Sequence, residues 1–185
     1  LDVVYARRIK AFLYSSAADA DLASNYSGVA YSATESLRAV VVPPFGGHLV
    51  GLLAHEANHV IQQNALGRPG TFFMNEGLPS AVLSSRFNEF GTPFLSTWTA
   101  SHAASIPPIT DLSDDEKWDG GNVAYKASAS FLAYLIQRSG PSPIRQLYQV
   151  PSSRFAARVR ELYGVTVEEL ERDWRAFCAT RAAGG

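Results

Sequence analysis

The spacing of hydrophobic residues changes near residue 49, from short β-prone runs to a helical periodicity. Residues 9–14 are largely apolar and end at a serine pair, which predicts a short strand. Residues 28–32 and 37–42 are two further β-prone runs separated by a polar turn, and they predict an antiparallel hairpin. A short helix is expected over residues 17–23. The first part of the chain therefore predicts a small antiparallel or mixed sheet.

From Leu49 onward, apolar residues recur at helical spacing, which predicts a long helix that ends near Gly67. Asn75 is a candidate N-cap for a second helix that runs from Glu76 to about Phe87. The remaining predicted helices cover residues 122–138, 142–150, 152–163 and 166–181.

Residues 91–121 lie between these helices and contain several prolines and glycines, so they predict a long, irregular segment. Segments of this kind are often functional, and this one could form the wall of a substrate cleft. Trp98 lies within it and is a candidate for lining a substrate pocket, although plain packing is the commoner role for such a residue.

The length of the chain and the order of these elements indicate its domain organisation. A chain of 185 residues corresponds to one domain. Strands come first and helices follow, which is typical of an α+β fold: a small N-terminal sheet, then a helical bundle. We therefore expect a single domain over residues 1–185, with the sheet at about 1–45 and the helices at about 48–181. The composition, 46% hydrophobic and 18% charged, excludes disorder for most of the chain.

Charge and hydropathy exclude several classes of partner. The formal net charge is −1 and there is no basic run beyond Arg7-Arg8, so we do not expect nucleic acid to bind. No apolar run approaches the ~20 residues that span a bilayer. Cys178 is the one cysteine, which excludes an internal disulfide and a cysteine-based metal cluster. The numbering begins at Leu1 without an initiator methionine, which is compatible with a signal peptide or an upstream domain before it.

The sequence His55-Glu56-Ala57-Asn58-His59 lies inside the first predicted long helix. Residues four apart share one face of a helix, so His55 and His59 could bind one zinc ion through their imidazoles. Glu56 points beside the metal instead of at it, where its carboxylate could accept a proton from a zinc-activated water. These residue types and this spacing predict a hydrolytic zinc site.

A zinc site of this kind requires a third protein ligand. Metzincins would have glycine at position 62 and histidine at position 65, whereas this chain has Gln62 and Ala65, so that class is excluded. A carboxylate from the next helix is the other solution, and Glu76 begins the second predicted helix. His48 and His102 have no partner at metal-ligand spacing and are not expected to be ligands.

Two segments, Leu52–Val60 and Phe73–Ala81, resemble the gluzincin metallopeptidases. The likeness is closest to the small peptidase MA-like domains, with their zincin-like fold, and more distant to the aminopeptidase N catalytic domain and thermolysin. In the aminopeptidase N family an Asn-Glu-Gly motif supplies the third zinc ligand, which implies this role for Glu76. Residues 125–135 are similar to the helix after the site, which often begins with a tyrosine that stabilises the oxyanion. The resemblance thus implies Tyr125 as a catalytic residue, with Tyr31, Tyr134 or a loop donor as alternatives.

The chain departs from these families at two places. Thermolysin-like gluzincins have an aspartate that orients the first histidine where this chain has Ser80, which puts the orientation of His55 in doubt. Aminopeptidases bind the substrate's amino terminus through an acid on an upstream strand, and residues 28–32 contain none. An endopeptidase is therefore favoured, with an extended substrate added to the edge of the predicted hairpin.

The sequence predicts zinc-dependent hydrolysis of a peptide or protein substrate, with His55, His59 and Glu76 as Zn²⁺ ligands and Glu56 and Tyr125 as catalytic residues. The alternative is a catalytically inactive, peptidase-like binding or regulatory module, which Ser80 favours and the intact Glu56 disfavours. The resemblance also implies export, to a secreted, periplasmic or cell-surface location. The substrate specificity and the oligomeric state are not given by the sequence.

Overall fold

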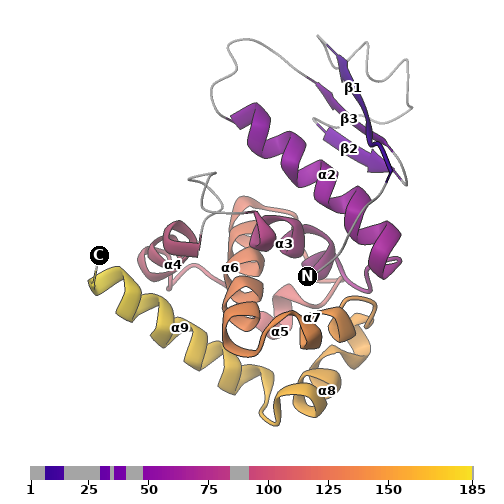
Figure 1. Cartoon of the computed structure of the whole chain (residues 1–185). Coiled ribbons are helices and arrows are strands. Elements are labelled where there is room, and N and C mark those ends of the chain that lie inside the picture. The colour runs from indigo at the N-terminus through magenta and orange to yellow at the C-terminus, as the bar shows by residue number, and fades with distance from the viewer. Residues whose placement is uncertain (1–6, 15–29, 34–35, 41–47, 84–91, 185) are drawn as a thin grey trace. The chain divides into compact units, whose positions relative to one another are not determined.

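The computed structural model describes residues 7–14, 30–33, 36–40, 48–83 and 92–184, and most of these residues are helical (Figure 1). The chain forms two compact units, Asp2–Gly67 and Arg68–Gly185. The boundary falls after the first long helix, so that helix belongs with the strands and not with the later helices.

The first unit contains three short strands and one helix, α2. Strand β1 (Lys10–Tyr14) pairs in parallel with β3 (Ser36–Val40), and β2 (Ala30–Ala33) pairs antiparallel with β3. The strand order is therefore β1-β3-β2. Helix α2 (His48–Leu66) packs against β2 and β3 (Figure 1). The short helix expected over residues 17–23 lies outside the described residues.

The second unit is helical, and α6 lies at its centre with α3, α4, α5, α7 and α9 in contact with it (Figure 1). Phe131 of α6 and Trp174 of α9 are fully buried, and their rings meet edge to face with centroids 5.5 Å apart. The helices of this unit are α3 (Phe72–Val82), α4 (Thr92–Ser101), α5 (Ile109–Leu112), α6 (Asn122–Ser139), α7 (Pro141–Leu147), α8 (Ser152–Tyr163) and α9 (Val167–Ala183).

Five of the predicted helices are confirmed within one or a few residues at each end: α2, α6, α7, α8 and α9. Their ends carry recognisable signals in the sequence. At the start of α9, the Thr166 hydroxyl accepts from the Glu169 N–H and the Glu169 carboxylate accepts from the Thr166 N–H, which is a complete capping box. Helix α8 ends at Gly164, which adopts the left-handed conformation with φ 73°.

The predicted start of the second helix at Asn75 is wrong. Helix α3 begins at Phe72, because the Thr71 hydroxyl accepts a hydrogen bond from the Met74 N–H at 3.1 Å and so caps the helix one turn earlier. The Asp115 carboxylate accepts from the Phe72 N–H at 2.8 Å. The helix also ends at Val82, before the predicted end at Phe87.

The prediction of an irregular segment over residues 91–121 is also wrong, because this stretch contains α4 and α5. Pro93 is compatible with a helix since it stands in the first turn of α4. The turns after α4 are held by α9: Arg175 donates to the carbonyls of Ala103 and Ile106, and Glu171 accepts from the Ile109 N–H. These contacts come from residues more than sixty positions away, so local composition could not show them.

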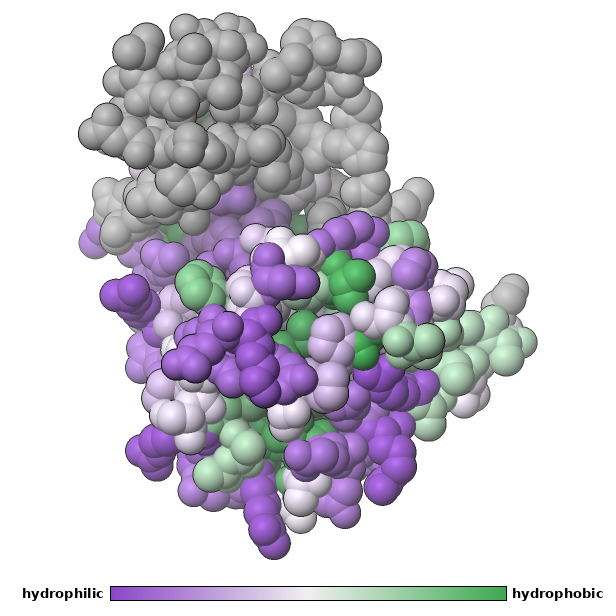
Figure 2. Space-filling model, turned by 180° about the vertical axis from the view of Figure 1, so that it is seen from behind, coloured by the Kyte–Doolittle hydropathy of each residue, from purple (hydrophilic) through white to green (hydrophobic). Residues whose placement is uncertain are grey.

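The surface of the described residues is mixed. On the face seen in Figure 2, hydrophilic residues cover most of the coloured surface, and hydrophobic residues form small patches between them. Within the described ranges, none of the helices has the length and apolar character that a membrane crossing requires.

Candidate metal centre

Helix α2 brings the two histidines of the motif together. The Nε2 atoms of His55 and His59 lie 3.0 Å apart, with the ring planes at 80° to one another. Both side chains are buried, with 9% and 5% of their surface exposed. The predicted pairing of these imidazoles is therefore present, and it follows directly from the four-residue spacing on a helix.

The spacing of the two nitrogens suits a metal ion such as zinc. Two ligands at ~2.0–2.1 Å from a tetrahedral zinc are about 3.3 Å apart, close to the 3.0 Å between the His55 and His59 Nε2 atoms. Metal binding through these atoms requires each imidazole to present an Nε2 without a hydrogen.

Glu56 lies between the two histidines in sequence and is buried to 8% exposure. Its buried position distinguishes it from a solvated acid on a helix surface. A buried carboxylate is costly unless it is paired or hydrogen-bonded, so Glu56 requires polar surroundings beside the two buried histidines.

Sequence analysis missed one residue on this face of α2. Gln62 follows His59 by three positions, is 2% exposed, and neither its Oε1 nor its Nε2 has a hydrogen-bond partner among the described residues. Buried amides are almost always hydrogen-bonded, so such a side chain is unusual. The i, i+4, i+7 spacing of His55, His59 and Gln62 could have indicated it, since these positions share one helix face.

Glu76, the predicted third ligand, lies in the middle of α3, in the second unit. It is half-buried, and its Oε1 accepts a hydrogen bond from the Asn75 side chain at 2.6 Å. The Ser80 hydroxyl donates to the Glu76 main-chain carbonyl at 3.4 Å. Among the described residues, His55, His59 and Glu76 have the residue types of a group that could hold a metal ion.

Gly77 explains how α3 can pack closely on α6. A Cβ at this position would lie 2.7 Å from Ser128 Cβ and 3.0 Å from Leu132 Cδ1. A side chain of any size would therefore separate the two helices. The glycine after Glu76 thus fixes the distance between the helix that carries this carboxylate and α6, the helix that carries Tyr125.

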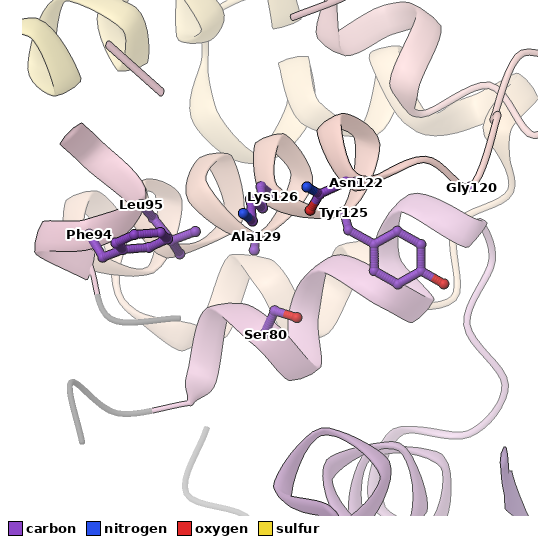
Figure 3. Close-up of a pocket in the computed structure, with 8 residues that line it drawn as sticks. All are labelled: Ser80, Phe94, Leu95, Gly120, Asn122, Tyr125, Lys126 and Ala129. Atoms are coloured by element: carbon purple, nitrogen blue, oxygen red, sulfur yellow. The ribbon is translucent and has the colours of Figure 1, made fainter. Parts of the chain in front are cut away.

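Tyr125 stands in the first turn of α6 and is half-buried. Its ring lies 5.8 Å from that of Trp118, and it lines a pocket of the second unit together with Ser80 (Figure 3). The alternative Tyr134 is buried, and its hydroxyl accepts a hydrogen bond from Arg138 at 2.7 Å. The side chain of Tyr31, the other alternative, is outside the described part of the structure.

Three other residues were considered in the sequence. His102 is exposed and stacks on Trp98 with ring centroids 4.6 Å apart. His48 begins α2, and its side chain lies outside the described part of the structure. Cys178 is buried next to the Ser130 hydroxyl, 3.8 Å from its sulfur, and burial raises the pKa of its thiol.

Comparison of the chain with protein-family models, with curated proteins and with solved structures gave no match.

Proposed function

We propose that this protein hydrolyses peptide bonds with a zinc ion held by His55, His59 and Glu76, in the manner of gluzincin metallopeptidases. The observation that carries the proposal is the buried pair of imidazole nitrogens, 3.0 Å apart, with a buried glutamate beside it. The donor set of two imidazoles and one carboxylate is that of catalytic zinc sites, which leave the fourth position for water.

Glu56 and Tyr125 have different roles in the proposed reaction. When bound, zinc supplies a Lewis acid that lowers the pKa of a water molecule to about 7. Glu56 accepts the proton of that water as it attacks the carbonyl carbon, and then delivers the proton to the leaving nitrogen. Tyr125 donates a hydrogen bond from its hydroxyl to the carbonyl oxygen as negative charge develops there.

The surroundings of Glu76 support its role as a ligand. The Asn75 amide donates to Glu76 Oε1 and so restrains the orientation of the carboxylate. Such an orienting partner is typically worth ~10–100-fold in metal affinity or activity. We infer that Asn75, which lies on the same helix as Glu76, orients this third ligand.

The sheet supports an endopeptidase. Strand β2 pairs only with β3 among the described strands, so its other edge can accept an extended peptide by strand addition. Main-chain hydrogen bonds of this kind bind a substrate along its length and do not require a free terminus.

Zinc content and turnover together test the proposal. The wild-type chain should bind one zinc per molecule after metal dialysis, and His55→Ala and His59→Ala should lose it. Glu56→Gln should retain the zinc while hydrolysis of a casein or peptide-library substrate falls by ~10²–10⁴-fold. A folded wild-type chain without zinc affinity, or a Glu56→Gln variant with undiminished turnover, would contradict the proposal.

The second candidate is a zinc-bound peptidase-like module without turnover. The observation that favours it is Ser80, a buried hydroxyl that bonds the Glu76 carbonyl and cannot replace a carboxylate partner for a histidine. One zinc per chain with no hydrolysis of any peptide in a diverse library would favour this second function.

A further inference from the structure

A pocket of about 470 Å³ opens on the second unit, between residues of α3, α4 and α6 (Figure 3). One part of its lining is apolar: Phe94 and Leu95 come from α4, and Ala129 comes from α6. In Figure 3 Phe94 and Tyr125 stand on opposite sides, and Ser80, Lys126 and Ala129 lie between them. The size is within the range of pockets that bind small molecules or substrate side chains.

Lys126 is the one charged side chain among the described residues that line this pocket. Its Nζ lies 5.7 Å from the centroid of the Phe94 ring and 5.5 Å from that of Trp98. In the part of the chain that the structure describes, it makes no ion pair with a carboxylate. Lys126 as a whole is half-buried, and its ammonium lies near two aromatic rings with donors available for a further partner.

The other lysine of this unit shows the contrast. Lys117 is exposed, and its Nζ lies 2.6 Å from Asp111 Oδ1 in an ordinary surface ion pair. Lys126 instead has a concave, largely apolar setting, and no acidic residue lines it among those that the structure describes. This combination is suited to a ligand that has both an apolar portion and a carboxylate.

The pocket is continuous with residues that the proposed function uses. Tyr125, the proposed oxyanion donor, lines it, and so does Ser80, which bonds the carbonyl of Glu76. Tyr125 and Lys126 are also adjacent in α6. A substrate group in this pocket would consequently belong to a residue close to the bond that is cleaved.

We propose that this pocket selects a carboxylate of the peptide substrate, next to the scissile bond, through Lys126. That the ligand is a peptide substrate depends on the proposed function, whereas recognition of a carboxylate by the pocket does not. Lys126 is the specificity-determining residue, and Phe94, Leu95 and Ala129 pack against the apolar stem that carries the carboxylate.

The preference follows from the strength of charge-assisted hydrogen bonds. An ammonium–carboxylate bond in a half-buried setting contributes more than a bond to a neutral amide, and the difference corresponds to about 10–100-fold in affinity. A glutamate should therefore be preferred over a glutamine of the same shape. The carboxylate could belong to an acidic side chain or to the carboxyl terminus of the peptide, since both present the same group.

The first experiment measures binding on the zinc-free chain, so it is independent of hydrolysis. The probes are 3-phenylpropionate and its neutral amide, 3-phenylpropionamide, titrated by NMR or calorimetry. We expect the carboxylate to bind at least about 10-fold more tightly than the amide. Lys126→Met should abolish this difference, Lys126→Arg should retain most of it, and Lys117→Met, the matched control outside the pocket, should leave it unchanged.

The second experiment measures specificity on the zinc-loaded chain. Peptides with an internal glutamate and an amidated carboxyl terminus are compared with their glutamine counterparts, and with glutamine peptides whose carboxyl terminus is free. Faster cleavage of the glutamate peptides would assign the carboxylate to a side chain, and faster cleavage of the free-terminus peptides would assign it to the terminus. In either case Lys126→Met should remove the preference while its zinc content stays at the wild-type value.

The outcomes separate this inference from the proposed function. Equal binding of the two probes, or a carboxylate preference that survives in Lys126→Met, would overturn the assignment of the pocket. Peptide hydrolysis without any acidic preference would overturn it as well, while the proposed function would stand. Carboxylate binding by a chain that hydrolyses no peptide would sustain the assignment and overturn the proposed function.

Discussion

A Cβ added to Gly77 would stand 2.7 Å from Ser128 Cβ, and this close approach joins α3 to α6 at the residue after Glu76. The glycine of the Asn-Glu-Gly sequence therefore has a packing role as well as a place in a motif. Because α3 carries Glu76 and α6 carries Tyr125, the same contact sets the relation between two proposed site residues of the second unit.

Gly77→Ala should destabilise the chain. The added methyl group would overpack the contact with Ser128 at a cost of about 1–3 kcal/mol, offset in part by the higher helix propensity of alanine. Urea unfolding followed by circular dichroism measures the change. Gly184→Ala is the matched control, since a Cβ there would meet its nearest atom at 3.6 Å, and it should change stability by less than about 0.5 kcal/mol.

The double variant Gly77→Ala/Ser128→Gly sharpens this test. Removing Ser128 Cβ makes room for the alanine, so the two substitutions should be less destabilising together than the sum of their separate effects. Strict additivity would show that the two residues do not compete for the same space.

Glu76→Ala should weaken zinc binding by about 100-fold or more, since loss of a ligand exceeds the ~10–100-fold effect of losing an orienting partner. Competition with a chromogenic chelator gives the affinity. Glu116→Ala removes an exposed acid in the same unit and should have no effect. Unchanged affinity in Glu76→Ala would mean that the third ligand is another group.

Tyr125→Phe should lower kcat by ~10²–10³-fold if its hydroxyl stabilises the developing oxyanion, with little change in KM or zinc content. Steady-state kinetics on a quenched fluorescent peptide give both constants. Tyr134→Phe should leave kcat unchanged, because Tyr134 is buried and is not among the described residues that line the pocket with Tyr125. The reverse pattern would transfer the role to Tyr134.

Tyr148 should make the fold sensitive to alkali. Its side chain is fully buried, its hydroxyl has no hydrogen-bond partner among the described residues, and burial raises its pKa from 10.0 to about 12. Between these values the unfolded chain loses the Tyr148 proton while the folded chain keeps it. The stability contribution is therefore complete below pH 10 and is lost as the pH rises to about 12, by about 1–2 kcal/mol.

Tyr148→Phe removes that titration. The variant should be at least as stable as the wild type at pH 8, because the lost hydroxyl had no partner, and it should lose less stability between pH 10 and pH 12. Urea unfolding at a series of pH values gives the comparison. Parallel loss of stability in the two chains over this range would disprove the assignment to Tyr148.

Cys178 should be unreactive in the folded chain. Its thiol is buried and its pKa is raised, so at pH 8 little thiolate is present and reagents have no access to it. The reaction with 5,5′-dithiobis(2-nitrobenzoate) should be slow in buffer and immediate in 8 M urea. Rapid reaction of the native chain would mean that the core around Ser130 opens readily.

The pairing of His55 and His59 was predictable because it depends on a period that every α-helix has. The same holds for the long helices, whose apolar residues repeat along one face. The cap at Thr71 was missed because Asn75 is an equally good capping residue in isolation, and the choice between them depends on Asp115 and on the burial of Phe73. Where two capping signals in the sequence are equally strong, contacts with residues distant in the sequence decide between them.

The sequence by itself determined the spacing of the motif, the existence and type of most helices and the chemistry of the candidate ligands, because these depend on neighbours within a few residues. Only the tertiary structure decided that α4 and α5 are helical, that Gly77 allows α3 to approach α6, that Lys126 lines a largely apolar pocket, and that Gln62 is buried without a hydrogen-bond partner among the described residues. Each of these features depends on which side chains, distant in the sequence, fill the surrounding space. Such long-range packing produces no periodic pattern in the sequence from which it could be predicted.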